Sequence, residues 1–120
     1  MPVTSQSTTR DNLIAGDFPL VTDAETLIAG QNLVRGAVLG KITASGKLTL
    51  SAAAAADGSE VPYAILSADT DATAGDAPCV AYKTGEFSEG ALTLGAGHTL
   101  AAIKDGLRDR GVFLKATRAA

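Results

Sequence analysis

The stretch that most constrains the fold is Val61–Leu92, which carries two apolar-rich runs, Tyr63–Ser67 and Ala77–Tyr82. Both runs contain β-branched and aromatic side chains, and such residues favour strands. The linker Ala68–Asp76 contains three Asp residues and Gly75, which favour turns. The residues Lys83–Phe87 then predict a tight turn that leads into another strand. We therefore expect two neighbouring strands that form the floor of a small, mostly β domain.

The length of 120 residues predicts one domain with a thin hydrophobic core. Hydrophobic residues make up 46% of the chain, but 23 of them are alanines, and there is no tryptophan. Alanine removes little apolar area from water, so such a core stabilises a monomer weakly. Association with other chains would bury further apolar surface and add stability.

The charge and the single cysteine narrow the classes of function. A formal net charge of −3 offers no broad attraction for nucleic acid or an anionic membrane. Cys79 alone excludes an intrachain disulfide, and its apolar run predicts a buried, inert thiol. No segment has the length of a membrane span, and no signal-peptide core is present at the N-terminus. Cations gather near the C-terminus and are interleaved with Asp105 and Asp109, which is typical of a solvated helix face. They are Lys104, Arg108, Arg110, Lys115 and Arg118.

The first twelve residues differ from the rest, because they form a polar segment rich in Ser and Thr. We expect an arm at residues 1–12 and a single β-rich domain at residues 13–120. The arm has too few apolar side chains to fold alone. Either it is a frayed end, or it becomes an extended strand when a partner offers a sheet edge.

Short strands separated by turns are predicted between residues 13 and 60. Leu20–Gly30 indicates a strand followed by an irregular segment. In Asn32–Thr43, two glycines interrupt a strand-like run and predict a bend or bulge where backbones approach closely. Ala44–Lys47 predicts a hairpin turn into Leu48–Leu50. The alanine run Ser51–Ala56 predicts a short helical turn, which Gly58 would end.

The C-terminal third predicts the only helix. Ala91–Leu94 is another short alternating run. Thr99 is then a candidate N-cap for a helix whose apolar stripe is Leu100, Ile103 and Leu107. Gly111 suits the position after the helix, and Val112–Ala116 should return as a strand. One helix of about three turns among six to eight short strands is the expected content.

No catalytic, cofactor or metal site is predicted. His98 has no nucleophile or base near it in the sequence. Its loop, Gly95–Thr99, has a G-x-G before a helix but lacks the third glycine of a dinucleotide site and the lysine of a P-loop. Asp69, Asp71 and Asp76 lack calcium-loop spacing and are explained by turns. The chain also has too few Cys and His residues for a structural zinc site.

Five segments stand out when they are taken in order: Gly16–Pro19, Gly36–Ile42 with Ser45–Lys47, Tyr63–Leu66, Tyr82–Phe87 and Leu107–Val112. Together they resemble the lambda-type head decoration protein family of tailed phages. The resemblance spans about residues 13–115, and its order and spacing carry it rather than any single motif.

The resemblance implies a structural virion protein rather than an enzyme. It implies a β-clip-like mixed fold and a homotrimer that binds the major capsid protein on the outer surface of the expanded capsid. The trimer would sit at local threefold positions and stabilise the shell. It also implies that the arm becomes ordered on the capsid and adds a strand there; the arm residues expected to bind are Pro2, Val3, Thr4, Ser5, Gln6, Ser7, Thr8 and Thr9. The alternative function is a small β-rich ligand- or carbohydrate-binding module, which would require an aromatic platform.

Overall fold

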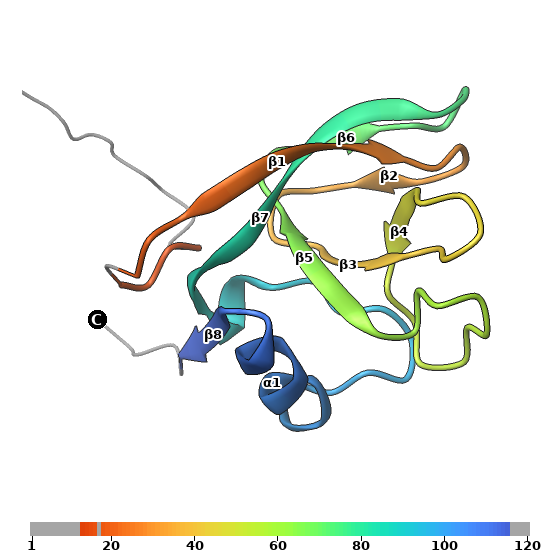
Figure 1. The fold of residues 1–120 in the computed structure, drawn as a ribbon. Coiled ribbons are helices and arrows are strands. Elements are labelled where there is room, and N and C mark those ends of the chain that lie inside the picture. The colour runs from red at the N-terminus through yellow and green to blue at the C-terminus, as the bar shows by residue number, and fades with distance from the viewer. Residues whose placement is uncertain (1–12, 17, 116–120) are drawn as a thin grey trace, which may run out of the picture.

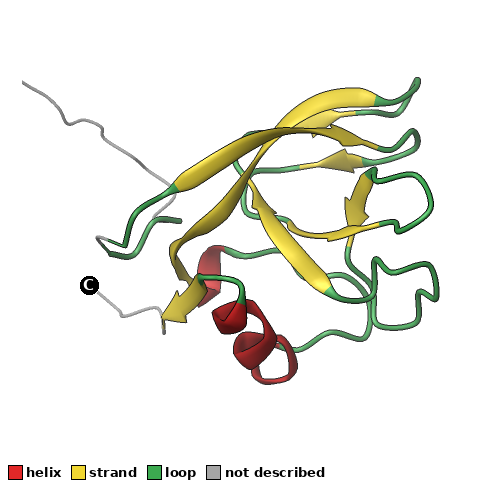
Figure 2. Ribbon diagram, in the orientation of Figure 1, coloured by secondary structure: helices red, strands yellow, loops and turns green. Residues whose placement is uncertain are grey.

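The computed structural model describes residues 13–16 and 18–115 (Figure 1). Strands dominate the described residues, and the one α-helix among them lies near the C-terminus (Figure 2). The predicted class, mostly β with a short C-terminal helix, is confirmed. The elements are β1 (Val21–Leu27), β2 (Asn32–Leu33), β3 (Val38–Lys41), β4 (Leu48–Leu50), β5 (Pro62–Leu66), β6 (Thr70–Asp71), β7 (Ala77–Ser88), the 3-10 helix η2 (Glu89–Ala91), α1 (Leu100–Asp109) and β8 (Val112–Lys115).

The main sheet closes on itself as a small barrel. Its strand order is β1-β4-β3-β5-β7-β8, and β1 also pairs with β7. Five strands therefore form a ring, and β8 lies in parallel beside the far half of β7. The expected pairing of the two central strands is present, with Ile65 opposite Tyr82 and Leu66 opposite Ala81. A separate two-stranded ladder joins β2 to β6.

Two apolar clusters fill the molecule. The first lies within the ring, because its residues come from all five ring strands; it contains Leu27, Ala37, Leu39, Leu48, Ala64, Leu66, Ala72, Cys79 and Ala81. The second lies between the sheet and α1; it contains Leu13, Val38, Ile65, Phe87, Ile103, Leu107, Val112 and Leu114. Alternate residues of β3 and β5 therefore serve opposite faces, as strand geometry requires. Five of these seventeen side chains are Ala or Cys, as the composition predicted.

The helix forms as its sequence predicts. Thr99 is the N-cap, and its hydroxyl accepts a hydrogen bond from the Ala102 N–H. Ile103 and Leu107 are buried, and Gly111 follows the helix with φ of 87°. The return strand is confirmed for Val112–Lys115. Among the described residues, no helix is long and apolar enough to cross a membrane.

The predicted tight turn at Lys83–Phe87 is wrong, because these residues continue β7 for its full length of 12 residues. Gly85 keeps an extended chain there with φ of 147°, which is rare for other residues. A Cβ at this position would also collide with the Leu20 and Phe87 side chains. Pairing of Gly85 with Val112 of β8 holds the segment in the sheet.

Two further local predictions are wrong. Ser51–Ala56 forms turns rather than a helical segment, because the Ala53 N–H donates to the Ala96 carbonyl of a distant loop. Ala91–Leu94 is not a strand either. Its first residue ends η2, and Thr93 makes only an isolated bridge to Ala37.

The glycine bend and the hairpin are confirmed. The β3–β5 register shifts between Leu39 and Gly40, and a Cβ on Gly40 would overlap the backbone of Ser59. The Ile42 N–H donates to the Lys47 carbonyl across the hairpin that joins β3 to β4. These close backbone contacts bring the Ser59 loop against the end of β3.

Candidate assembly surfaces

The N-terminal part of the described chain is fixed to the end of β7. The Ser88 N–H donates to the Leu13 carbonyl at 2.8 Å, and the Ala15 N–H donates to the Glu86 carbonyl at 2.8 Å. Ile14 bridges Phe87 in antiparallel orientation, and the Leu13 side chain is buried. The chain therefore enters the domain as a short strand at the end of the sheet. We call Leu13–Ala15 the arm root.

The last described strand ends beside the arm root. Lys115 of β8 lies opposite Ser88, on the other side of β7 from Leu13. Its Nζ is 2.9 Å from a carboxylate oxygen of Glu86. Phe18 packs edge-on against Phe113 of β8, with ring centroids 4.8 Å apart. Figure 1 shows the segment before β1 and β8 at one end of the molecule. The first and last described residues, Leu13 and Lys115, therefore flank the same end of β7.

The arm residues named from the sequence, Pro2–Thr9, lie outside the described residues. The boundary between arm and domain, placed between residues 12 and 13, stays a prediction.

A charged cluster surrounds Tyr63 at one opening of the barrel. The Nζ of Lys83 lies 2.7 Å from Glu25, 3.6 Å from Asp23 and 2.9 Å from the Tyr63 hydroxyl. Burial opposes the charge of Lys83, but the hydrogen bonds that it donates to Glu25 and Tyr63 outweigh this effect and raise the pKa of this lysine. Lys83 is therefore a fixed cation that holds β1, β5 and β7 together.

Two more cations face the same ring from outside. The Nζ of Lys41 lies 5.2 Å from the Tyr63 centroid, and the Cζ of Arg110 lies 5.6 Å from it. Cations at this range are attracted by the face of an aromatic ring. Beside them is an open hollow of about 510 Å³; it is lined by Lys41, Thr43, Gly58, Val61, Tyr63 and Arg110. We call it the Tyr63 groove.

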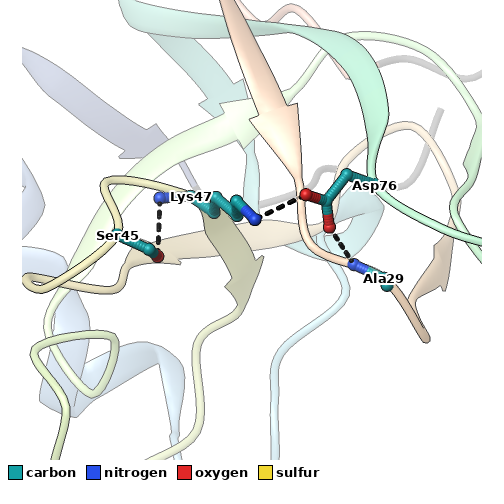
Figure 3. Close-up of polar contacts among 4 residues, drawn as sticks. All are labelled: Ala29, Ser45, Lys47 and Asp76. Atoms are coloured by element: carbon teal, nitrogen blue, oxygen red, sulfur yellow. Dashed lines mark hydrogen bonds and ion pairs between the residues drawn. The ribbon is translucent and has the colours of Figure 1, made fainter.

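Asp76 joins three loops at another rim of the barrel (Figure 3). One of its oxygens accepts from the Ala29 N–H at 2.9 Å, and the other lies 2.5 Å from Lys47 Nζ. Ser45 in turn accepts a hydrogen bond from the Lys47 N–H. The hydrogen bond from Lys47, followed by that from Ala29, lowers the pKa of Asp76. The loop after β1, the β3–β4 hairpin and the start of β7 are thus linked.

Of the other two turn aspartates, Asp71 acts as the sequence predicted, but Asp69 does not make a local turn bond. Asp69 accepts the N–H of Arg35, 34 positions earlier, at 2.9 Å. Asp71 accepts both the N–H and the hydroxyl of Thr73, and the hydroxyl contributes most to lowering the pKa of Asp71. Among the described residues, no group of three or more His, Cys, Asp or Glu side chains is placed to hold a metal ion.

His98 has a partner that the sequence did not reveal. Its Nε2 lies 3.0 Å from the hydroxyl of Ser51, a buried residue 47 positions earlier. The Ser51 hydroxyl donates its one proton to the Ser59 carbonyl at 2.6 Å, so the histidine nitrogen must donate to Ser51. The histidine therefore does not act as a base toward Ser51, and the pair ties the loop before α1 to the end of β4. The glycines of that loop allow close packing, since a Cβ on Gly95 would overlap the Ser51 carbonyl.

Cys79 is buried in the barrel, as predicted. Burial, followed by the negative charge of Glu25, raises the pKa of this thiol. A thiol with a raised pKa forms little thiolate and reacts slowly.

The C-terminal cations divide into two groups. Lys104 and Lys115 pair with Glu89 and Glu86, and Arg108 lies 4.0 Å from Asp105 on the exposed face of α1. The predicted solvated helix face is therefore correct for Lys104 and Arg108. Arg110 instead turns toward Tyr63. Arg118 lies outside the described residues.

A sequence profile of the bacteriophage lambda head decoration protein D family matches residues 2–112. The chain belongs to this family. A search of curated proteins returned no match. The predicted family is thus confirmed over almost the whole chain, and the matched region includes the barrel and α1.

Membership of this family places the protein in the phage head. The protein is a structural component of the phage head, and it decorates the outer surface of the virion capsid. Sequence reasoning named the arm but not the Tyr63 groove. Its residues lie on β3, in the β3–β4 hairpin, in the loop between β4 and β5, on β5 and after α1, so no local pattern brings them together.

Proposed function

We propose that this protein forms a homotrimer that binds the major capsid protein at local threefold positions of the expanded shell and stabilises it. The observation that carries the proposal is the family match, which begins at residue 2 and so includes the arm with the folded domain. The proposal divides the chain into an arm, residues 1–12, and a decoration domain, residues 13–120.

The geometry of the arm root supports binding by strand addition. Leu13–Ala15 already follows the hydrogen-bonding direction of β7, so the preceding residues leave the domain from an extended backbone. A segment that gains main-chain hydrogen bonds only on the capsid would couple its ordering to binding. Residues Pro2–Thr9 are the proposed contact segment.

The composition of the core supports association. Alanine and cysteine supply a large share of the barrel interior, and several large apolar side chains stay exposed at the surface; Leu20, Val21, Val34, Val61 and Val80 are 44–52% exposed. Surface of this kind is available for burial between subunits or against the shell. Three identical arms on one trimer would then raise the overall affinity through effective concentration.

A binding assay with emptied, expanded shells that lack decoration protein tests the proposal. The full chain should co-sediment with shells, raise their melting temperature and scatter light as a particle of about three times 12.0 kDa when free. A chain that lacks residues 1–12 should keep its fold and its trimer mass. It should bind shells more weakly, because each lost main-chain hydrogen bond contributes about 0.5–1.5 kcal/mol.

Two outcomes would contradict parts of the proposal separately. A stable monomer at micromolar concentration would count against the trimer. Equal binding by the full and truncated chains would count against the arm as the contact segment.

A further inference from the structure

The Tyr63 groove holds two cations whose charge the chain does not neutralise. Within the part of the chain that the structure describes, neither Lys41 nor Arg110 has a carboxylate at ion-pair distance or a hydrogen-bond acceptor. Both are held within 6 Å of the centre of one aromatic ring. The other described lysines each face a carboxylate; the pairs are Lys47–Asp76, Lys83–Glu25, Lys104–Glu89 and Lys115–Glu86.

This arrangement is unusual for a chain with a net charge of −3, in which acidic partners are in excess. Asp57 and Glu60 lie on the loop that lines the groove, but their carboxylates accept bonds from Ser59 and Gly58 of that same loop. Neither of these carboxylates forms an ion pair with Lys41 or Arg110. The groove also has an apolar side, because Val61 is 48% exposed at its rim.

We propose that the Tyr63 groove binds an acidic side chain carried on a segment of the capsid protein, as a second contact besides the arm. This inference rests on the proposed function. A carboxylate between Lys41 and Arg110 would neutralise their charge, while an adjacent apolar side chain would pack against Val61 and the edge of Tyr63. The hollow of about 510 Å³ is large enough for more than a single small anion.

The occupant is assigned to the shell rather than to a second copy because nearly all described carboxylates of this chain already have a partner within it. Among the described residues, every Asp and Glu except Asp109 already has an ion-pair or hydrogen-bond partner within the chain. A contact between copies through this groove would therefore share a carboxylate with an internal partner in most arrangements. An acidic segment of another protein meets no such cost.

The test compares three full-length double variants on expanded shells. Lys41→Gln with Arg110→Gln removes the two groove charges, and Lys41→Glu with Arg110→Glu reverses them. Lys104→Gln with Arg108→Gln is the matched control, because it removes two exposed charges from α1. Each variant is titrated against shells at low and high salt, and its unfolding temperature and its mass in solution are measured in parallel.

We expect the groove Gln pair to weaken shell binding about tenfold at low salt and much less at high salt. The Glu pair should bind more weakly still, and the control should bind like the unchanged chain. Equal binding by the groove and control variants would overturn the inference while leaving the proposed function intact. Loss of the trimer mass in the groove variants alone would also overturn it, because the occupant would then be a second copy. Failure of the unchanged chain to bind shells would reject the proposed function itself.

Discussion

Lys47 and Asp76 lie 29 positions apart in the sequence, and their charged groups meet at 2.5 Å across the rim of the barrel (Figure 3). Asp76 also accepts the Ala29 N–H, so one carboxylate links three loops. We predict that Asp76→Ala lowers the melting temperature more than Lys47→Met does. Removing the carboxylate takes away both bonds, whereas removing the ammonium leaves the Ala29 bond in place. Thermal unfolding of both variants checks the order, and equal losses would contradict it.

Asp76 and two other aspartates predict that the protein loses stability in acid. Asp57, Asp71 and Asp76 have pKa values below their ordinary 3.8, because hydrogen bonds from Ser59, Thr73 and Lys47 favour the ionised form. A depressed folded-state pKa adds stability above the unfolded-state value, and that stability is lost as pH falls through the folded-state value. The free energy of unfolding should therefore fall below about pH 4. Asp76→Asn should start lower at pH 7 and lose less on acidification. If the free energy of unfolding fell equally with pH in the unchanged chain and in Asp76→Asn, Asp76 would not contribute to this loss.

Two glycines predict opposite effects of the same added methyl group. A Cβ on Gly40 would overlap the Ser59 backbone, so Gly40→Ala should destabilise the protein by about 1–3 kcal/mol. Gly106 lies on the exposed side of α1 with nothing within 4 Å, so Gly106→Ala should stabilise it by about 1 kcal/mol. Urea unfolding measures both changes. If Gly40→Ala left the free energy of unfolding unchanged, the Ser59 loop would be able to shift at little cost.

Local signals were enough to predict α1. Its N-cap, its apolar stripe and its final glycine all lie within thirteen residues, and each acts on its own neighbours. The hairpin after β3 is predictable for the same reason. The family resemblance rested on segments of this kind, and the match to residues 2–112 confirms it.

Long-range contacts explain the errors. The residues Lys83–Phe87 have the composition of a turn, but β8 and the arm root pair with them from both sides and keep them in β7. The alanine run has the best helix propensity in the chain, yet a bond between Ala53 and Ala96 keeps it in turns. The Tyr63 groove was missed because Lys41 and Arg110 meet only after the barrel has closed.

We predict that substitutions of Cys79 lower stability by small amounts, and that Ser lowers it more than Ala. Its side chain is 6% exposed, and its thiol makes no disulfide. Cys79→Ala should cost about 1 kcal/mol of stability, and Cys79→Ser should cost about 1–3 kcal/mol because it buries a hydroxyl. Native labelling by a thiol reagent at pH 8 should be slow, since the thiol pKa is raised. Fast labelling would mean that the barrel opens at β7.

We predict that residue 13 contributes to folding stability, whereas residues 1–12 contribute to shell binding. Leu13 is 1% exposed, and its side chain packs in the cluster beneath α1. Leu13→Ala should therefore cost about 2–5 kcal/mol of folding free energy. Removal of residues 1–12 leaves Leu13 and its bond with Ser88 in place, so it should change the melting temperature little. Calorimetry of both variants and of the full chain makes the comparison. A large loss of stability in the truncated chain would show that residues 1–12 belong to the folded domain.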